Sequence, residues 1–311
     1  MKNKIGSGKI LITGAGGFIG GGLFEKIKHY HPIGVVSNTS FQKSLNHLSS
    51  EKRDIVPPTT VQGLGGTHSK RNGNDQNFIE ADLRDEKRVK EIFDQYKPST
   101  VFHFAGFSSP QKNEGNPQWA RDSNLGITKN ILNNLSDGAH VIFPSTDKVF
   151  DGSHPNPDEE AEVKPLWLYA DLKYQCEKII NKKTNKFHIV RLPIVHSLGK
   201  LTGANRGSFI DKAIIDLKAG KEVIVFKNVQ RCFVKLEELL NLFEIFIHDT
   251  NYGTYHVGTQ MLSYYDRLCV LCDELGIDWK DKIIPVEGNA NPLVQNLNAD
   301  KLKNTFKVVL T

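Results

Sequence analysis

The chain has 311 residues, of which 39% are hydrophobic and 24% are charged, and its net charge is +5. This length is enough for a substantial core and for one or two domains. The positive charges are dispersed, so we expect no nucleic acid as a partner. There is no long apolar run and no hydrophobic signal core at the N-terminus, and we therefore expect a cytoplasmic protein without a membrane segment.

The four cysteines are too few and too scattered for a disulfide framework. Cys269 and Cys272 form a C-x-x-C, but they lie in L-C-V-L-C-D-E-L, which is typical of an amphipathic helix and has no second pair of metal ligands. We predict that both pack in a core and that the chain has no metal site.

Strand and helix patterns alternate from residue 9 to about residue 192, which predicts an α/β fold with a doubly wound parallel sheet and helices on both faces. One stretch interrupts the alternation. Residues 47–77 are polar, rich in Gly, Ser, Thr and Pro, and longer than a usual connection. We interpret this stretch as a surface insertion.

A glycine-rich turn follows the first strand. Residues 9–13 read K-I-L-I-T, and G-A-G-G-F-I-G follows at residues 14–20, where a helix opens. In a dinucleotide-binding turn the first glycine permits the tight turn, the second lets the backbone approach the pyrophosphate, and the third lets the helix pack on the strand. The helix N-terminus also offers unpaired N–H groups to the phosphates. The residues assigned to cofactor binding here are Gly14, Gly16, Gly17, Phe18, Ile19 and Gly20.

The second strand, residues 32–40, reads P-I-G-V-V-S-N-T-S and ends without an acidic residue. Enzymes that prefer NAD place an acid there, about twenty residues past the glycines, to bind the ribose 2′-OH. Asn38 and the nearby Lys43 suit a 2′-phosphate instead, so the sequence favours NADP(H) over NAD(H). The alternative is that the strand end is merely polar and the choice of cofactor is loose.

A second motif carries acid–base chemistry. Residues 145–152 read S-T-D-K-V-F-D-G, and Y-A-D-L-K follows at residues 169–173. Thr146 ends an apolar run, which places it at the carboxyl end of a strand. Tyr169 and Lys173 are four residues apart and share one face of a helix. A neighbouring ammonium favours the phenolate, so we expect Lys173 to lower the pKa of Tyr169 from about 10. The alternative is that Y-x-x-x-K is only an exposed helix face.

Together the two motifs resemble the extended short-chain dehydrogenase/reductase superfamily, and the resemblance covers nearly the whole chain. D-L-R-D at residues 82–85 is similar to the segment that closes over the adenine. V-F-H-F-A-G at residues 101–106 resembles the strand and turn beside the nicotinamide ribose, and Asn124 resembles the start of the N-x-x-G-T helix that supports the site. The resemblance thus adds Asp82, Leu83, Phe104, Ala105 and Gly106 to the cofactor site, with Tyr169 and Lys173.

The same resemblance implies contacts with a nucleotide-sugar substrate. R-L-P at residues 191–193 resembles the strand before the substrate lobe. Arg231 in Q-R-C-F-V resembles the arginine of R-D-F-V that can pair with the nucleotide diphosphate, because a guanidinium matches phosphate oxygens. Cys232 departs from the aspartate of that pattern. Ser108 is also assigned to the substrate.

Among the subfamilies, S-T-D-K-V-F-D-G is most similar to the S-T-D-Y-V-F-D-G of dTDP-4-dehydrorhamnose reductases. This implies NAD(P)H-dependent reduction of a nucleotide-linked 4-keto-6-deoxysugar, with Tyr169 as proton donor, Lys173 on the cofactor ribose and Thr146 on the carbonyl. Lys148 stands where that family usually has tyrosine. Under this interpretation Asp147 is a turn residue and Lys148 an exposed substitution.

Three alternatives stay open. In hexose 4,6-dehydratases an acid and a base follow the catalytic Ser/Thr, and there Asp147 and Lys148 would be catalytic. An epimerase would shuttle hydride through a tightly bound NAD. The third alternative is a non-catalytic, nucleotide-binding regulatory subunit, as in methionine adenosyltransferase. The presence of Thr146, Tyr169 and Lys173 argues against it, because a non-catalytic relative need not retain all three.

The resemblance also predicts the domains. A Rossmann-type domain comprises residues 1–192 and 233–257, and a smaller, discontinuous substrate lobe comprises residues 193–232 and 258–311. Residues 154–165 could line the substrate cleft, and His103 and His196 are expected to be hydrogen-bonded neighbours of the site rather than general bases. We also expect a homodimer through the helices at residues 124–135 and 169–180, with Ile127, Ile131 and Leu135 at the seam.

Overall fold

The computed structural model describes residues 8–37, 77–200 and 207–311. Its centre is a seven-stranded sheet in the order β11-β6-β5-β4-β1-β2-β3, in which every neighbouring pair is parallel. The strands are β1 (Ile10–Thr13), β2 (Ile33–Val36), β3 (Asn77–Glu80), β4 (Thr100–His103), β5 (His140–Thr146), β6 (Phe187–Leu192) and β11 (Gly253–His256). The strand order turns back between β1 and β4, which confirms the predicted doubly wound Rossmann-type fold.

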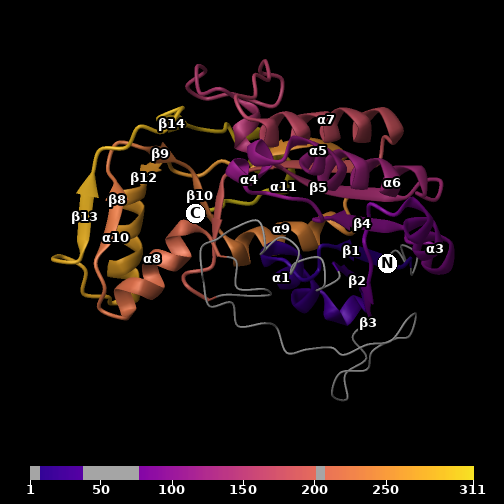
Figure 1. The fold of residues 1–311 in the computed structure, drawn as a ribbon, viewed down its shortest axis with the longest axis horizontal. Helices are drawn as coiled ribbons and strands as arrows, with labels where there is room; N and C mark the ends of the chain where they lie inside the picture. Colours follow the sequence, from indigo (N-terminus) through magenta and orange to yellow (C-terminus); the bar gives the residue numbers. More distant parts are fainter. Residues whose placement is uncertain (1–7, 38–76, 201–206) are drawn as a thin grey trace.

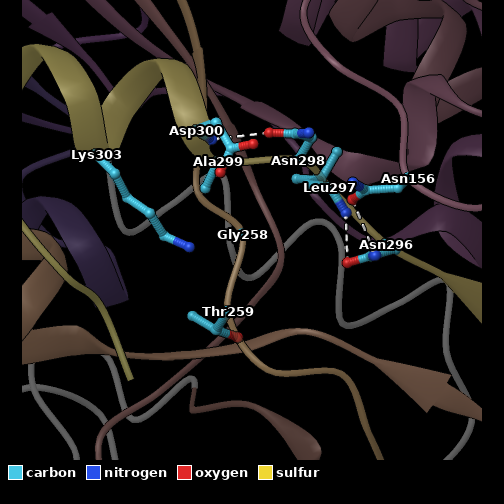
Figure 2. Close-up of a pocket in the computed structure, with 9 residues that line it drawn as sticks. All are labelled: Asn156, Gly258, Thr259, Asn296, Leu297, Asn298, Ala299, Asp300 and Lys303. Atoms are coloured by element: carbon cyan, nitrogen blue, oxygen red, sulfur yellow. Dashed lines mark hydrogen bonds between the residues drawn. The ribbon is translucent and has the colours of Figure 1, made fainter.

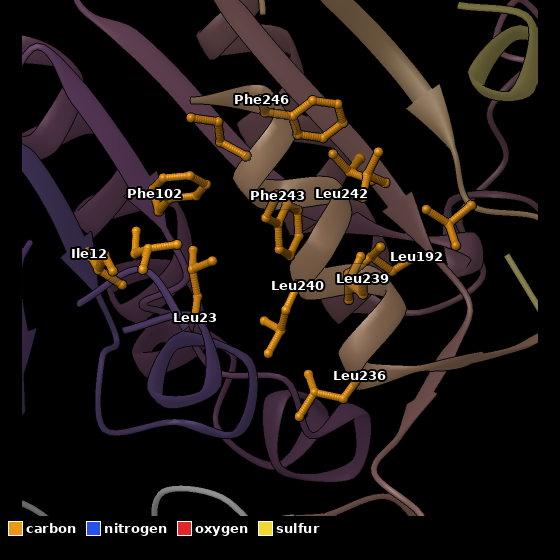
Figure 3. Packing of buried hydrophobic residues seen from close by; sticks show 14 of the residues in the cluster. Ile12, Leu23, Phe102, Leu192, Leu236, Leu239, Leu240, Leu242, Phe243 and Phe246 are labelled. Atoms are coloured by element: carbon orange, nitrogen blue, oxygen red, sulfur yellow. The ribbon is translucent and has the colours of Figure 1, made fainter. Parts of the chain in front are cut away.

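Helices cover both faces of this sheet (Figure 1). One face carries α1 (Phe18–Lys26) and α9 (Leu236–Phe246), and the other carries α3 (Glu86–Tyr96), α6 (Ile127–Asn133) and α7 (Leu168–Lys183). The side chains of β1 alternate between the faces: Ile12 packs in the cluster under α1 and α9, and Leu11 in the cluster under α3. Phe243 and Phe246 of α9 are fully buried against the first face (Figure 3). Strands buried on both faces account for the continuous apolar runs in the sequence.

Between β4 and α6 the chain forms a compact helical segment. It contains α4 (Pro110–Gly115), α5 (Pro117–Arg121) and a π-helical turn, η2 (Asp122–Gly126), that continues into α6. Two short 3₁₀ helices lie elsewhere, η1 (Lys28–Tyr30) after α1 and η3 (Asp147–Val149) directly after β5. π-turns are frequent at functional sites, and this one is next to the loop that follows β4.

The smaller lobe lies at one end of the molecule (Figure 1). Its helices are α8 (Phe209–Lys218) and α10 (Tyr264–Leu275), and its strands form short sheets from β8 (Val223–Phe226), β9 (Gln230–Arg231), β12 (Leu262–Ser263), β13 (Ile283–Val286) and β14 (Val294–Gln295). Strands β7 (Ile194–His196) and β10 (Phe233–Lys235) pair in parallel. The four cysteines are free, and Cys269 and Cys272 of α10 pack in the core of this lobe, as predicted.

The C-terminal helix differs from the predicted boundary. α11 (Asp300–Phe306) was assigned to the substrate lobe with residues 258–311, but Leu302 is buried in the cluster under α9 and Phe306 packs against that cluster. The Phe306 ring centre lies 5.1 Å from that of Phe246 and 5.0 Å from that of Tyr255. The chain therefore returns to the large domain before it ends, because its last apolar side chains are buried there.

The residues predicted at the dimer seam are buried within the chain itself. Ile131 is 0% and Ile127 8% exposed, and both pack in the cluster under α3, while Leu135 packs against the same cluster from its edge. The apolar residues of α6 therefore belong to the core of the chain. The prediction that Ile127, Ile131 and Leu135 form a dimer interface is wrong. A homodimer through other faces of the two predicted helices stays a prediction. Residues 47–76 of the predicted insertion lie outside the described ranges, and within those ranges no helix is long and apolar enough to cross a membrane.

Candidate active site

The glycine turn has the geometry that the sequence predicts. Gly14 has a φ of +69°, in the left-handed region, and a Cβ there would lie 2.8 Å from the backbone N of Ala105. A Cβ on Gly20 would lie 2.4 Å from the carbonyl oxygen of Gly14, so only glycine lets α1 approach the strand end. Gly17 is the N-cap of α1, and Phe18 and Ile19 form its first turn. The end of β1 and the start of α1 can therefore receive a pyrophosphate at Gly16 and Gly17.

Of the remaining residues predicted to bind the cofactor, the structure describes Asp82 and Leu83 but not Asn38 and Lys43. Asn38 and Lys43 lie outside the described residues, which continue only to the exposed Ser37 after β2. Asp82 is exposed after β3, and its carboxylate pairs with the guanidinium of Arg84 at 2.5 Å, which holds the pKa of that carboxyl below its usual value. Leu83 is 5% exposed and belongs to the core. Of Asp82 and Leu83, only Asp82 is therefore at the surface, where an adenine could bind.

The loop after β4 is held from both sides. The amide N–H of Ala105 donates to Thr13 Oγ1 at 3.1 Å, which joins the loop to the end of β1. The amide N–H of Phe107 donates to Asn124 Oδ1 at 3.0 Å, and Asn124 Nδ2 donates to the carbonyl oxygen of Ala120 at 2.9 Å. Gly106 has a φ of +151°. Asn124, on the π-turn, therefore fixes the loop of Phe104, Ala105 and Gly106, and Ser108 is exposed on the same loop.

The structure brings Thr146, Tyr169 and Lys173 together. Thr146 is the last residue of β5, and Tyr169 and Lys173 lie one turn apart on α7, which packs against β5. Tyr169 is 9% exposed and lies next to Thr146, whose hydroxyl acts to lower its pKa. Lys173 Nζ donates to the carbonyl oxygen of Pro144 at 2.6 Å and lies 4.1 Å from the ring centre of Phe143. The interpretation of Y-x-x-x-K as an exposed helix face is therefore wrong here.

The pKa of Tyr169 differs from the expectation. Burial and the nearby Asp147 raise the pKa of this phenol above its usual value, and the hydroxyl of Thr146 only partly opposes them. Burial lowers the pKa of Lys173 to about 8, because removal from water disfavours the ammonium. The predicted lowering of the Tyr169 pKa by Lys173 is not found, since the ammonium is directed at Pro144 and burial dominates.

Asp147 and Lys148 form η3 directly after Thr146. Asp147 is 6% exposed, and burial raises the pKa of its carboxyl, while the charges of Lys148 and Arg231 act in the opposite direction. Gln295 of β14 donates to the carbonyl oxygen of Asp147 at 2.7 Å. Lys148 is half-buried. Lys148 is therefore not the exposed position that the reductase interpretation expected. Asp147 is a turn residue as expected, but it is buried, with Gln295 of the lobe against it.

The guanidinium of Arg231 binds backbone carbonyl groups, whereas the sequence predicted a contact with the nucleotide diphosphate. It is 5% exposed, and its two terminal nitrogens donate to the carbonyl oxygens of Gln230, Leu293 and Pro292 at 2.7 to 2.8 Å. The guanidinium therefore joins β9 to the segment before β14. It does not present the open fork that was predicted to receive a diphosphate. The neighbouring Cys232 is buried, and its thiol donates to Asn296 Oδ1 at 3.1 Å.

A buried polar network beside the site was not predicted. Glu177 of α7 accepts a short hydrogen bond from Ser145 Oγ and is paired with Arg191 of β6 at 2.8 Å. Arg191 also bonds to His256 Nε2 at 3.1 Å, and Glu159 accepts from the backbone N–H of His256 at 2.8 Å. The signal for Glu177 was its spacing, since it follows Tyr169 and Lys173 by eight and four residues on one helix face.

The two predicted hydrogen-bonded histidines are confirmed as such. His103 lies 3.0 Å from Thr13 Oγ1 through Nδ1 and 3.0 Å from Thr128 Oγ1 through Nε2. Burial lowers its pKa to about 3, so it is a neutral link between β1 and α6. His196 Nε2 lies 2.9 Å from Arg267 Nη2 in the lobe, and burial lowers its pKa to about 4.

A polar pocket of about 170 Å³ lies where the lobe segment before α11 crosses the end of β11 (Figure 2). Its walls include the amides of Asn156 and Asn296, the hydroxyl of Thr259 and the ammonium of Lys303. A Cβ on Gly258 would lie 2.0 Å from the carbonyl oxygen of Leu297, so the two segments touch through their backbones. Asn156 belongs to the segment 154–165, which the sequence left open as a solvated loop or as a lining of the substrate cleft.

Comparison with curated proteins gives distant relatives. The chain is 25% identical over 206 residues to methionine adenosyltransferase 2 subunit beta of Xenopus tropicalis, which is 64% of this chain and 61% of the relative. The match thus spans less than two thirds of that relative's length.

Solved structures share the fold along nearly the whole chain. A dTDP-4-dehydrorhamnose reductase of Bacillus anthracis in complex with NADP has a TM-score of 0.71 at 20% identity, covering 96% of this chain and 91% of the other. A UDP-glucose 4-epimerase of Thermotoga maritima with UDP-glucose has a TM-score of 0.73 at 19% identity, covering 95% and 91%. The sequence model of the NAD dependent epimerase/dehydratase family matches residues 10–258. Because this match covers most of the chain, the protein belongs to the NAD dependent epimerase/dehydratase family.

Proposed function

We propose that the protein reduces a nucleotide-linked 4-keto-6-deoxysugar with NADPH. The observation that carries the proposal is the convergence of Thr146, Tyr169 and Lys173 at the carboxyl edge of the sheet that also carries the glycine turn. Ligands of doubly wound sheets bind in the crevice at this edge, at the point where the strand order reverses. The named function of the reductase with the same fold supports the same chemistry.

In the proposed reaction the reduced nicotinamide, when bound, supplies a hydride to C4 of the sugar. Tyr169 gives its phenolic proton to the C4 oxygen, so the carbonyl becomes a hydroxyl. The phenol carries its proton at neutral pH and can donate it, although the pKa raised by burial makes it a weaker acid than a free phenol. Thr146 orients the carbonyl oxygen, and Lys173 holds the cofactor ribose.

NADPH is the proposed cofactor because no acid ends the second strand and Asn38 and Lys43 follow it. A carboxylate there would repel a 2′-phosphate, whereas an amide and a cation would accept it. Dissociation constants for NADPH and NADH, measured by quenching of protein fluorescence, test this preference. An affinity advantage for NADH would contradict it.

A 4,6-dehydratase is the second candidate, and the buried Asp147 favours it. A carboxyl with a raised pKa, next to Thr146 and Tyr169, is suited to carry a proton during elimination. The discriminating assay supplies an intact nucleoside diphosphate hexose without reduced cofactor. A 4-keto-6-deoxy product would establish the dehydratase and end the reductase proposal.

A non-catalytic subunit is the third candidate, because the curated relative named above is a subunit of methionine adenosyltransferase. Such a protein would bind a dinucleotide without turning over any sugar. The main experiment therefore incubates the purified protein with NADPH and a panel of nucleotide 4-keto-6-deoxysugars and records NADPH oxidation. Turnover of at least one sugar supports the reductase. Dinucleotide binding without turnover, together with a stable complex with a methionine adenosyltransferase catalytic chain, would replace it.

A further inference from the structure

The catalytic helix α7 is attached to β5 at three successive levels. Tyr169 lies next to Thr146, Lys173 Nζ donates to the carbonyl oxygen of Pro144 at 2.6 Å, and Glu177 accepts from Ser145 Oγ. The three helix residues are spaced by four, so they lie on one face along two turns. The first two belong to the proposed chemistry, and Glu177 is the third member of the same row.

Glu177 is the only acid in this row, and it is 4% exposed. Burial of a carboxylate is costly unless it is paired and hydrogen-bonded, and Glu177 has both kinds of partner in Arg191 and Ser145. Burial lowers the pKa of Lys173, and Cys176 and, to a smaller extent, the negative charge of Glu177 oppose this effect. A carboxylate buried at this place therefore affects both the position of α7 and the charge of its lysine.

The other end of the network reaches the substrate side. Arg191 bonds to His256 Nε2 at 3.1 Å, and His256 Nδ1 lies 3.2 Å from the carbonyl oxygen of Pro157. That carbonyl also accepts from the backbone N–H of Asn298 at 2.9 Å, in the segment that lines the polar pocket. The network thus joins α7 to the segment 154–165 and to the lobe segment before α11.

We propose that Glu177 is a positioning residue that holds Lys173 as an ammonium against β5, in register with Tyr169 and Thr146. Its consequence for cofactor binding and turnover rests on the proposed function, whereas its effect on Lys173 itself does not. Two other titratable groups act on Lys173 itself, Cys176 on α7 and His103 on β4, and Tyr169 lies one turn away on α7. Further charged groups lie next to these neighbours: Asp147 near Tyr169, Arg191 on Glu177 and Lys129 near Cys176.

The test is a titration of Lys173 by NMR in protein labelled with ¹³C at lysine Cε, with the Lys173 signal assigned by its loss in Lys173→Arg. In Glu177→Gln the amide keeps the shape but loses the charge, and we expect the midpoint to fall by about one pH unit. Glu177→Asp keeps the charge and should leave the midpoint near that of the parent. An unchanged or higher midpoint in Glu177→Gln overturns the proposal.

Ser145→Ala is the matched control, because it removes a hydrogen bond of Glu177 without a change of charge. It should alter thermal stability and leave the Lys173 midpoint in place; a shift as large as that of Glu177→Gln would assign the effect to packing and overturn the proposal. If Glu177→Gln does not fold, Glu177→Gln with Arg191→Met removes both charges of the pair, a change that buried ion pairs often tolerate. The midpoint should again fall, but by less than in Glu177→Gln, because removal of the Arg191 cation acts in the opposite direction.

The pH dependence of NADPH affinity gives the functional readout. Its alkaline limb should move to lower pH in Glu177→Gln, in step with the Lys173 midpoint, and stay in place in Glu177→Asp. If Glu177→Gln lowers the Lys173 midpoint but the parent protein binds no dinucleotide, the inference on Glu177 stands and the proposed function is wrong. The two failures are therefore distinguishable.

Discussion

Lys173 Nζ lies 2.6 Å from the carbonyl oxygen of Pro144 and donates a hydrogen bond to it. This contact joins α7 to the strand that ends in Thr146. It orients an ammonium in a half-buried position where burial lowers its pKa to about 8. The lysine is therefore close to its titration range at physiological pH, and small changes around it should alter its charge.

Gly17→Val should abolish dinucleotide binding while the protein stays folded. A Cβ at Gly17 would lie 3.2 Å from the carbonyl oxygen of Gly14, so the turn can adjust, but the valine methyl groups would occupy the space of the pyrophosphate. Fluorescence quenching by NADPH measures the loss. Gly115→Val is the control, since a Cβ there has no neighbour within 4 Å. Parent-like NADPH affinity in folded Gly17→Val would refute the assignment of this turn.

Tyr169→Phe should lower kcat by about a hundred- to ten-thousandfold, because it removes the proton donor and keeps the buried ring. The measurement is NADPH oxidation with the sugar that the panel identifies. Tyr174→Phe removes a hydroxyl from the same helix, where Tyr174 is half-buried under Lys178, and should keep the parent kcat. Equal turnover by Tyr169→Phe and the parent would exclude the phenol from the mechanism.

Lys148→Tyr separates the reductase from the dehydratase. In a reductase Lys148 is not needed, and the variant should stay within about threefold of the parent in activity, as for a substitution outside the chemistry. In a dehydratase the same variant should lose turnover, because the side chain carries a proton. Both activities are measured side by side on the two substrate classes described above. Loss of sugar reduction in folded Lys148→Tyr would contradict the reductase proposal.

The stability of the fold should fall on acidification through its buried histidines. Burial lowers the pKa of His140 to about 3, whereas an unfolded histidine titrates near 6.5. Between these values the unfolded chain binds a proton that the folded chain does not, so the free energy of unfolding decreases as the pH falls. The stabilisation is complete above pH ~6.5 and is lost at about 1.4 kcal/mol per pH unit below it.

His140→Gln should therefore lose about 2 kcal/mol less than the parent between pH 7 and pH 5. Urea unfolding at the two pH values measures the difference. His154→Gln, at an exposed position, should keep the pH dependence of the parent. If the free energy of unfolding falls equally in the parent and in His140→Gln between pH 7 and pH 5, His140 does not contribute to the pH dependence of stability.

Some features follow from the sequence alone because they depend on local order along the chain. The turn at Gly14 and Gly20 was predictable, since a tight strand-to-helix turn admits only glycine at those positions. The placement of Tyr169 and Lys173 on one helix face followed from a spacing of four. The order of parallel strands and helices followed from the alternation of their patterns.

Other features were decided only by contacts between segments far apart in sequence. The burial of Asp147 depends on β14, and the pairing of Glu177 depends on Arg191 of β6, so neither could be read from its neighbours along the chain. An apolar helix face does not specify what covers it, which is why Ile131 looked like an interface and α11 like part of the lobe. The sequence determined which groups the site contains. The tertiary structure decided their charge and their partners, because both depend on the distance to water and to opposite charges that only the packed fold sets.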